Sequence, residues 1–126
     1  ISYYMKELRG INGIVVDGAI RDKAGIIDVG FPTFARGATP RLFGTQGPGA
    51  INVPIQCGGV TVNPGDLVFG DDDGVVVVPK EDIERVLEGA DLCLEGELDR
   101  LSRMKAGEKM SDIFNCDVKI AKLSQE

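Results

Sequence analysis

The chain of 126 residues contains no histidine, and it has only three cysteines. Without histidine, this chain cannot supply a Ser-His-Asp or Cys-His nucleophile, an imidazole base or a histidine ligand for zinc. Cys57, Cys93 and Cys116 form no CxxC pair, which argues against a disulfide framework or a zinc knuckle and favours a reducing, cytoplasmic location. Acid-base or metal chemistry in this chain therefore depends on carboxylates, Arg, Lys, Tyr, Cys or bound water.

Long apolar runs and basic stretches are also missing. No run approaches the roughly 20 apolar residues of a membrane span, so we expect no membrane partner. The net charge is -6, from 14 Lys+Arg and 20 Asp+Glu, and it argues against direct binding of nucleic acid, which would require a basic stripe. The 43% of hydrophobic residues is typical of a folded globular domain.

Glycine is abundant, at 17 of 126 residues, or roughly twice the usual ~7%. It separates short segments with different hydrophobic periods. Residues 4–10 resemble a helix end closed by Gly10. The apolar run 13–16 predicts a buried strand, Asp17-Gly18 a tight turn, and residues 19–29 a helix that ends at Gly30. This order of elements is the start of a βα unit.

The middle of the chain is predicted to be mainly β. A short strand is expected over residues 32–37, and a loop rich in Gly, Pro and Thr over 37–50. Residues 51–62 predict one long strand or a bent pair. Two apolar strands, 67–70 and 75–78, follow, separated by turn residues.

The final third predicts one long helix. Pro79 and the acids after it match helix-start preferences. An amphipathic stripe of about six turns follows, in which Gly89 and Gly96 could cause a kink or close packing. Its apolar members are Ile83, Val86, Leu87, Ala90, Leu94, Leu98 and Leu101. The predicted fold class is therefore α/β, with a compact β core and a long C-terminal helix, and the predicted domain covers residues 1–108, followed by a tail over 109–126.

Arg21 and Asp22 are the most informative candidate site residues. They follow a predicted strand, and ligand sites of α/β proteins gather beyond the carboxyl ends of strands. The Arg21 guanidinium suits a carboxylate, and the Asp22 oxygens suit a hard cation such as Mg²⁺ or Mn²⁺. Together the two residues could hold a 2-oxo acid. The alternative is a pair of surface helix charges that form a helix cap or an ion pair.

Three motifs resemble one known family. They are GIVVDGAIRD (13–22), GFPTFARGATPR (30–41) and NVPIQCGGVTVNPGDLVFGDDDGVVVVP (52–79). In this order they resemble the family of the regulator of ribonuclease activity A and the 4-hydroxy-4-methyl-2-oxoglutarate aldolases, over residues from about 10 to about 108. The resemblance implies a swivelling β/β/α fold and a homotrimer, or a hexamer, with sites between subunits.

The resemblance also implies a chemistry. The enzymes of this family use a divalent metal, Mg²⁺ or Mn²⁺, to cleave 4-hydroxy-2-oxo diacids to pyruvate by a retro-aldol reaction, and they decarboxylate oxaloacetate. Arg21 would bind the pyruvyl carboxylate and support the enolate, and Asp22 would ligate the metal. The alternative is a non-catalytic regulator that binds ribonuclease E or a helicase. Such members commonly lack the Asp of this pair, so the presence of Asp22 favours the enzyme.

Two further acids of the family site are harder to place. One lies twenty residues before the Arg-Asp pair, a position that would precede Ile1, so we expect that the N-terminal part of the domain is missing and that this chain could be inactive alone. The other comes from the C-terminal helix of a neighbouring subunit. Its spacing to Ala106-Gly107-Glu108 makes Glu97 the candidate catalytic acid, with an exposed helix charge as the alternative.

Other candidates are weaker. Asp71-Asp72-Asp73 lacks the ligand spacing of a cation site and predicts a solvated hairpin turn. Residues 44–49 lack a phosphate-loop pattern and predict a plain loop. Cys57 is expected in the core. Arg36 and Arg41 could reach a substrate or a neighbouring subunit, although solvent is the default.

Overall fold

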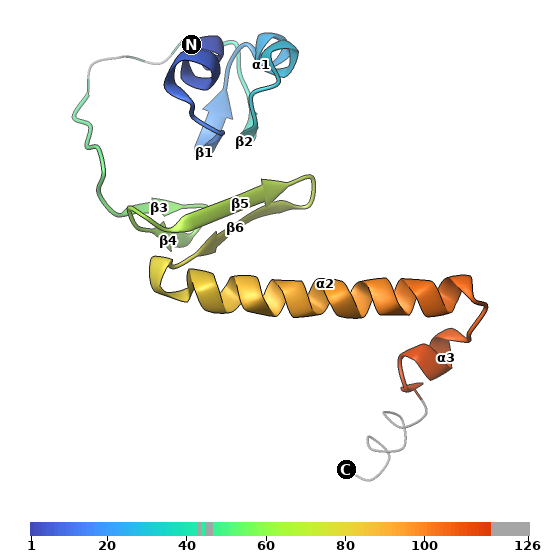
Figure 1. The fold of residues 1–126 in the computed structure, drawn as a ribbon. Coiled ribbons are helices and arrows are strands. Elements are labelled where there is room, and N and C mark those ends of the chain that lie inside the picture. Colours follow the sequence, from blue (N-terminus) through green and yellow to red (C-terminus); the bar gives the residue numbers. More distant parts are fainter. Residues whose placement is uncertain (43, 45–46, 117–126) are drawn as a thin grey trace. The chain divides into compact units, whose positions relative to one another are not determined.

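The computed structural model describes residues 1–42, 44 and 47–116. Parts of the predicted loops at 37–50 and 44–49 and of the predicted tail at 109–126 therefore lie outside the described residues. The chain divides into two compact units, Ile1–Glu81 and Asp82–Glu126. The first unit holds all six strands described and a short helix, and the second holds the long helix (Figure 1). The expected mixture of helix and strand with a long C-terminal helix is thus confirmed.

A βαβ arrangement forms the first part of unit 1. Strand β1 (Ile14–Ile20) pairs in parallel with β2 (Thr33–Ala38), and helix α1 (Lys23–Val29) connects them. Gly30 ends α1 in the left-handed conformation, as predicted, and its N–H donates to the carbonyls of the last turn. A π-helical turn, Tyr4–Leu8, precedes β1.

Strand β1 is longer than the sequence indicated. The predicted turn at Asp17-Gly18 and the predicted helix start at Ala19 are wrong, because Ala19 and Ile20 pair with Gly37 and Ala38 of β2. The register shifts between Val16 and Ala19, where two residues of β1 oppose one of β2, so one extra residue is accommodated as a bulge inside the strand. The helix begins only at Lys23, and Arg21 and Asp22 are left at the very end of the strand.

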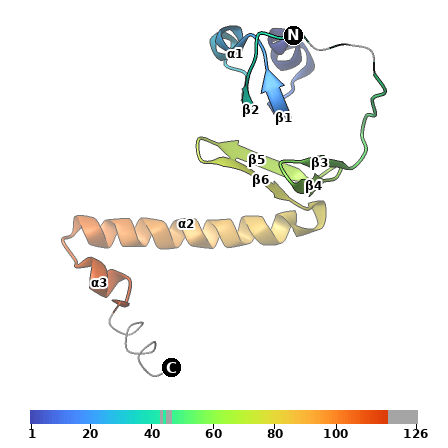
Figure 2. The ribbon, with the colours of Figure 1, turned by 180° about the vertical axis from the view of Figure 1, so that it is seen from behind.

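Two antiparallel hairpins follow. Residues 51–62 form the bent pair: β3 (Ile55–Cys57) and β4 (Val60–Val62) are joined by Gly58 and Gly59, both with positive φ. A two-residue turn of this kind matches the twist of the strands it connects. Strands β5 (Leu67–Asp71) and β6 (Gly74–Val78) form the second hairpin, seen from behind in Figure 2.

One aromatic contact links β2 to β5. The Phe34 ring lies so close to Gly70 that a Cβ atom on this glycine would be 2.7 Å from the ring. A hollow of about 510 Å³ lies between the same segments, and its lining includes Val15, Pro32 and Val68. Gly70 is therefore required for the contact between the parallel pair and the second hairpin.

Unit 2 is a long helix followed by a short one. Helix α2 (Ile83–Lys105) runs without a break through Gly89 and Gly96, and α3 (Met110–Ile113) contacts it. The Arg103 guanidinium forms two hydrogen bonds with the Glu108 carboxylate, one of them 2.8 Å from Nε to Oε2. Ile113, only 5% exposed, is buried beside this corner.

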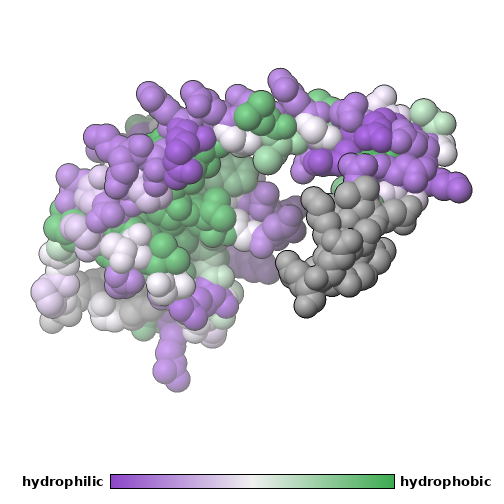
Figure 3. Space-filling view, turned by 90° about the horizontal axis from the view of Figure 1, so that it is seen from below, coloured by the Kyte–Doolittle hydropathy of each residue, from purple (hydrophilic) through white to green (hydrophobic). Residues whose placement is uncertain are grey.

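Much apolar surface remains uncovered. Among the described residues, only Phe31 and Ile113 are buried apolar residues. Hydrophobic residues gather in a broad area on the face seen in Figure 3. The exposed large side chains of unit 1 include Val15, Ile27, Ile55, Val60, Leu67, Val68, Phe69 and Val76, and those of α2 include Leu87, Leu92, Leu94, Leu98 and Leu101. Exposed apolar surface of this extent is typical of faces that bind another protein, a ligand or a membrane.

No helix in the described part of the chain is both long and apolar enough to cross a membrane.

Candidate functional site

The carboxyl ends of β1 and β2 lie at the same edge of the parallel pair. Ile20 pairs with Ala38, and the Thr39 N–H donates to the Ile20 carbonyl at 2.9 Å. Arg21 follows β1 and Arg41 follows β2 just beyond this last hydrogen bond. The two segments therefore leave the sheet as neighbours, at the edge where α/β proteins place their ligands.

Asp22 has an unusual backbone for a residue other than glycine. Its φ and ψ are 61° and 39°, in the left-handed region, and it stands directly before α1. Its carbonyl accepts a hydrogen bond from the Ile26 N–H at 3.1 Å, but its side chain makes no capping bond. Asparagine and aspartate tolerate this conformation better than other side-chain-bearing residues. The left-handed turn thus directs the chain from the strand into the helix and leaves the Asp22 carboxylate unused by the helix.

Arg21 and Asp22 form a loose ion pair. The Arg21 Nε lies 3.5 Å from the Asp22 Oδ2, and the two side chains are 40% and 76% exposed. The predicted alternative of a helix cap is wrong, because the Asp22 side chain makes no capping hydrogen bond. The other alternative, an ion pair, is observed. An exposed pair of this kind stabilises a protein little. Both groups consequently remain accessible to a ligand.

The Asp22 carboxylate fits one class of metal ion. Within the described residues, no three His, Cys, Asp or Glu side chains converge on a common point, so an all-protein cage is not formed there. Mg²⁺ retains several waters and is commonly held by one or two carboxylates together with oxygens of the substrate. A single exposed carboxylate beside an arginine is compatible with a metal ion held jointly by the protein, water and substrate. It is not compatible with a structural metal site enclosed by protein ligands.

Asp17 belongs to a cluster that the sequence analysis missed. From its position in β1 it accepts hydrogen bonds from Arg36 Nε of β2 and, at 2.9 Å, from the Gly58 N–H in the turn between β3 and β4. The Arg36 guanidinium, followed by the Gly58 N–H, lowers the pKa of Asp17, and Asp17 in turn raises the pKa of Arg36. Arg36 is thus held by a protein carboxylate instead of facing solvent alone. No local sequence pattern joins Asp17, Arg36 and Gly58, which come from three separate segments.

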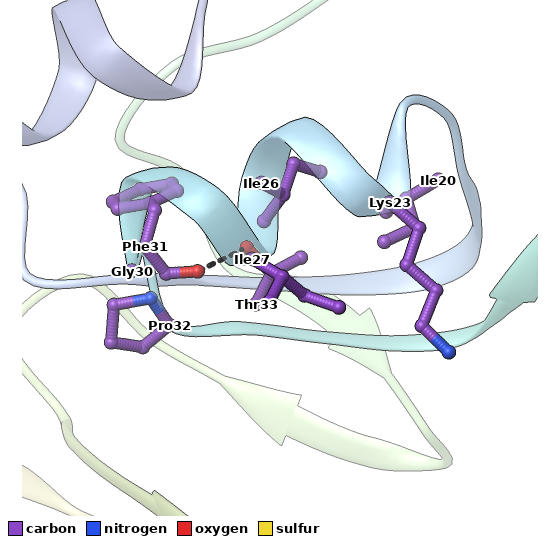
Figure 4. Close-up of a pocket in the computed structure, with 8 residues that line it drawn as sticks. All are labelled: Ile20, Lys23, Ile26, Ile27, Gly30, Phe31, Pro32 and Thr33. Carbon is purple, nitrogen blue, oxygen red and sulfur yellow. Dashed lines mark hydrogen bonds between the residues drawn. The ribbon is translucent and has the colours of Figure 1, made fainter.

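A separate hollow lies between α1 and the start of β2. Its volume is about 330 Å³, and Figure 4 shows Lys23 and Ile20 at one end and Phe31 and Pro32 at the other. The Thr33 hydroxyl donates to the Phe31 carbonyl at 3.0 Å. Most of the lining is apolar, and neither Arg21 nor Asp22 lines it. This hollow does not suit a small, doubly charged acid.

Glu97 lies in the other unit, near the middle of α2, and it is exposed. Leu94 and Leu101 lie three residues before and four residues after it, so all three share one helix face. Glu97 is thus an exposed helix charge, as the alternative has it, and it lies between two exposed leucines. Its proximity to the Arg21-Asp22 pair of any subunit stays a prediction.

The weaker candidates are also placed. Within the acidic turn, the Asp73 N–H donates to Asp71 Oδ1 at 2.9 Å, as in an ordinary hairpin. Cys57 is half-buried in β3 and not fully enclosed in a core.

Comparison with known proteins gives a consistent result. Residues 3–77 match the family described as RraA-like, Aldolase/RraA. The chain is 52% identical, over 86 residues, to a protein of Halalkalibacterium halodurans named "Putative 4-hydroxy-4-methyl-2-oxoglutarate aldolase"; the match covers 68% of this chain and 41% of that protein.

Two solved structures share the fold. An uncharacterized protein from Pseudomonas syringae pv. tomato superposes with a TM-score of 0.72 at 30% identity, covering 82% of this chain and 52% of that one. Streptomyces coelicolor RraAS2, described as an unusual member of the RNase ES inhibitor RraA protein family, gives 0.63 at 34% identity, covering 82% and 54%. The expected fold class is thus confirmed. The chain spans about half the length of the curated relatives it matches.

Proposed function

Because the chain belongs to the RraA-like family, we propose that its protein is a divalent-metal-dependent lyase. It would cleave 4-hydroxy-2-oxo diacids of the 4-hydroxy-4-methyl-2-oxoglutarate type to pyruvate, and it would decarboxylate oxaloacetate. The observation that carries the proposal is the Arg21-Asp22 pair at the carboxyl end of β1, with the Asp22 carboxylate free of the helix it precedes. The name of the Halalkalibacterium relative supports the aldol cleavage.

The roles of the two residues follow from their chemistry. Arg21 binds the carboxylate of the 2-oxo acid with its planar guanidinium and orients the scissile bond. Asp22 would hold Mg²⁺ or Mn²⁺, and such an ion would supply Lewis-acid polarisation of the 2-oxo group. No step assigned to this chain needs histidine.

Glu97 would complete the site from a neighbouring subunit of a homotrimer or hexamer. Its place among exposed leucines supports this assignment, because an apolar helix face that packs on another subunit would bring the carboxylate into the interface.

The test is pyruvate release from 4-hydroxy-4-methyl-2-oxoglutarate by the full-length protein, with and without EDTA. We expect activity that EDTA abolishes and Mg²⁺ restores. Arg21→Lys and Asp22→Asn should each lower kcat/KM by about 10²-fold or more, because each removes a group that touches the reacting atoms. Asn keeps the left-handed backbone that alanine would strain. Asp28→Asn, on the exposed surface of α1, is the matched control. EDTA-resistant activity would contradict the metal, and pyruvate release unaffected by either variant would contradict the site.

Subunit mixing tests Glu97. If it serves a neighbouring subunit, two inactive variants, Arg21→Ala and Glu97→Gln, should regain activity when refolded together. In an equal mixture, about a quarter of the sites would then combine an intact Arg21 from one subunit with an intact Glu97 from its neighbour. Absence of any recovery, with the mixed oligomers shown to form, would place both residues in one subunit or remove Glu97 from the site.

The second candidate function is a regulator of a ribonuclease, favoured by the description of the Streptomyces RraAS2 structure. A full-length protein that releases no pyruvate from any 2-oxo acid, yet retains a ribonuclease E partner after Asp22→Asn, would favour this function over the lyase.

A further inference from the structure

The proposed substrate carries a second carboxylate, and the structure points to the residue that would bind it. In a 4-hydroxy-2-oxo diacid the distal carboxylate lies at the opposite end of the molecule from the one assigned to Arg21. A buried or half-buried anion needs a cation or several hydrogen-bond donors nearby. A residue that binds this carboxylate should therefore be a cation that shares an edge of the fold with Arg21 and is not already paired.

Besides Arg21, three cations stand near the carboxyl edge of the parallel pair, and they differ in their surroundings. Arg36 is neutralised by Asp17. Lys23 lines the apolar hollow between α1 and the start of β2. Arg41 is exposed, and its guanidinium takes part in no ion pair with the residues that the structure describes.

The backbone around Arg41 is fixed by two hydrogen bonds. The Thr39 N–H donates to the Ile20 carbonyl at 2.9 Å, which continues the β1–β2 ladder by one bond. The Arg41 N–H donates to the Thr39 hydroxyl at 3.2 Å, a short turn that begins at the end of β2. Between them, Pro40 restricts the backbone. Arg41 therefore follows β2, the strand that pairs with the strand before Arg21. Its backbone is anchored through Thr39 to Ile20, the residue directly before Arg21.

We propose that Arg41 is the specificity-determining residue that binds the distal carboxylate of a 2-oxo diacid, while Arg21 binds the carboxylate next to the 2-oxo group. This inference rests on the proposed function for the identity of the diacid. It adds a preference: the site binds 2-oxo diacids more tightly than 2-oxo monoacids of equal length. A guanidinium can meet a carboxylate in a bidentate way, so lysine at this position would be a weaker substitute.

The experiment compares two ligands that differ only at the distal end. 2-Oxoglutarate and 2-oxopentanoate have the same number of carbons, and only the former has a second carboxylate. Their dissociation constants are measured by calorimetry on the full-length protein with Mg²⁺. We expect Arg41→Gln to weaken 2-oxoglutarate binding by about tenfold or more and to leave 2-oxopentanoate binding unchanged, with Arg41→Lys between the two.

Matched variants make the result specific. Arg36→Gln removes a neighbouring arginine that is already paired, and Lys23→Gln removes the other cation. Neither should change the ratio of the two dissociation constants. Equal weakening of both ligands by Arg41→Gln, no effect on either, a selective loss with Lys23→Gln instead, or equal binding of both ligands by the unmodified protein would each overturn the inference.

The outcomes separate this inference from the proposed function. A protein that binds 2-oxoglutarate selectively through Arg41 but releases no pyruvate would contradict the lyase and not the assignment of Arg41. Suppose instead that the protein releases pyruvate and that Arg41→Gln does not lower the rate with a diacid substrate relative to a monoacid. This result would contradict the assignment of Arg41 and not the lyase.

Discussion

Asp17 and Arg36 lie on adjacent parallel strands and form an ion pair that is extended by the Gly58 N–H from a third segment. One carboxylate thus joins β1, β2 and the turn between β3 and β4. Asp17 lies within the bulge of β1, between Val16 and Ala19, so the cluster holds the part of the strand that leads to the Arg21-Asp22 pair.

Replacing Asp17 by Asn should destabilise the protein at neutral pH. The partners of Asp17 lower its pKa in the folded state, so its contribution is present above the ordinary value of 3.8 and is lost as the pH falls through the lowered folded pKa. Thermal unfolding of the wild type and Asp17→Asn should differ at pH 7 and converge in strong acid. Asp72→Asn, in the exposed turn of the second hairpin, is the control and should show no such difference. A constant gap across the pH range would show that the charge of Asp17 is not the cause.

Gly70→Ala should disrupt the contact between β2 and β5. The new Cβ would lie 2.7 Å from the Phe34 ring, so the ring or the strand must move, at a cost of about 1–3 kcal/mol in the free energy of unfolding. Gly37→Ala, with nothing within 4 Å of its Cβ, is the matched control. Denaturant unfolding measures both. The double variant Gly70→Ala/Phe34→Leu should recover part of the loss, and purely additive effects would contradict the contact.

Ile113→Ala should weaken the corner between α2 and α3. Ile113 is 5% exposed, and removal of such a side chain typically costs about 2–5 kcal/mol. Met110→Ala, in the same short helix but 56% exposed, should cost far less. The helical circular dichroism signal, followed through thermal unfolding, distinguishes the two. Equal effects of both variants would indicate that the corner does not form in solution.

Glycines of unit 2 should respond to alanine in opposite directions. Gly89 lies inside α2 with nothing within 4 Å of its Cβ, so Gly89→Ala should stabilise the helix by about 0.5–1 kcal/mol. Gly107 has a φ of +84°, and alanine there should destabilise the helix end by about 1–2 kcal/mol. The same unfolding measurement applies, and a loss of stability with Gly89→Ala would reveal a packed surface at that position.

Local signals predicted most of the elements. Each correct prediction depends on a few adjacent residues. These predictions are the end of α1 at Gly30, the two hairpins and the apolar stripe of α2. The end of β1 was mispredicted because Ala19 and Ile20 are held extended by Gly37 and Ala38, which lie eighteen positions away in the ladder. Local helical spacing could not reveal that competing pairing.

The candidate site was predictable only in part. Arg21 and Asp22 were recognised from a motif, and the structure adds that the Asp22 carboxylate makes no helix cap. The Asp17 cluster was missed because its three members come from separate segments that no short pattern joins. The role of Glu97 stays a prediction, since it lies on a different unit from the Arg21-Asp22 pair.

The left-handed backbone of Asp22 limits how this position can diverge among relatives. Selection for the turn alone would accept glycine or asparagine there, since both adopt that conformation readily. Selection for a carboxylate leaves aspartate, because glutamate lacks the short side chain that makes the left-handed region tolerable. A homologue that keeps the turn without the carboxylate should therefore carry glycine or asparagine at this position, whereas alanine or a β-branched residue would indicate a different turn.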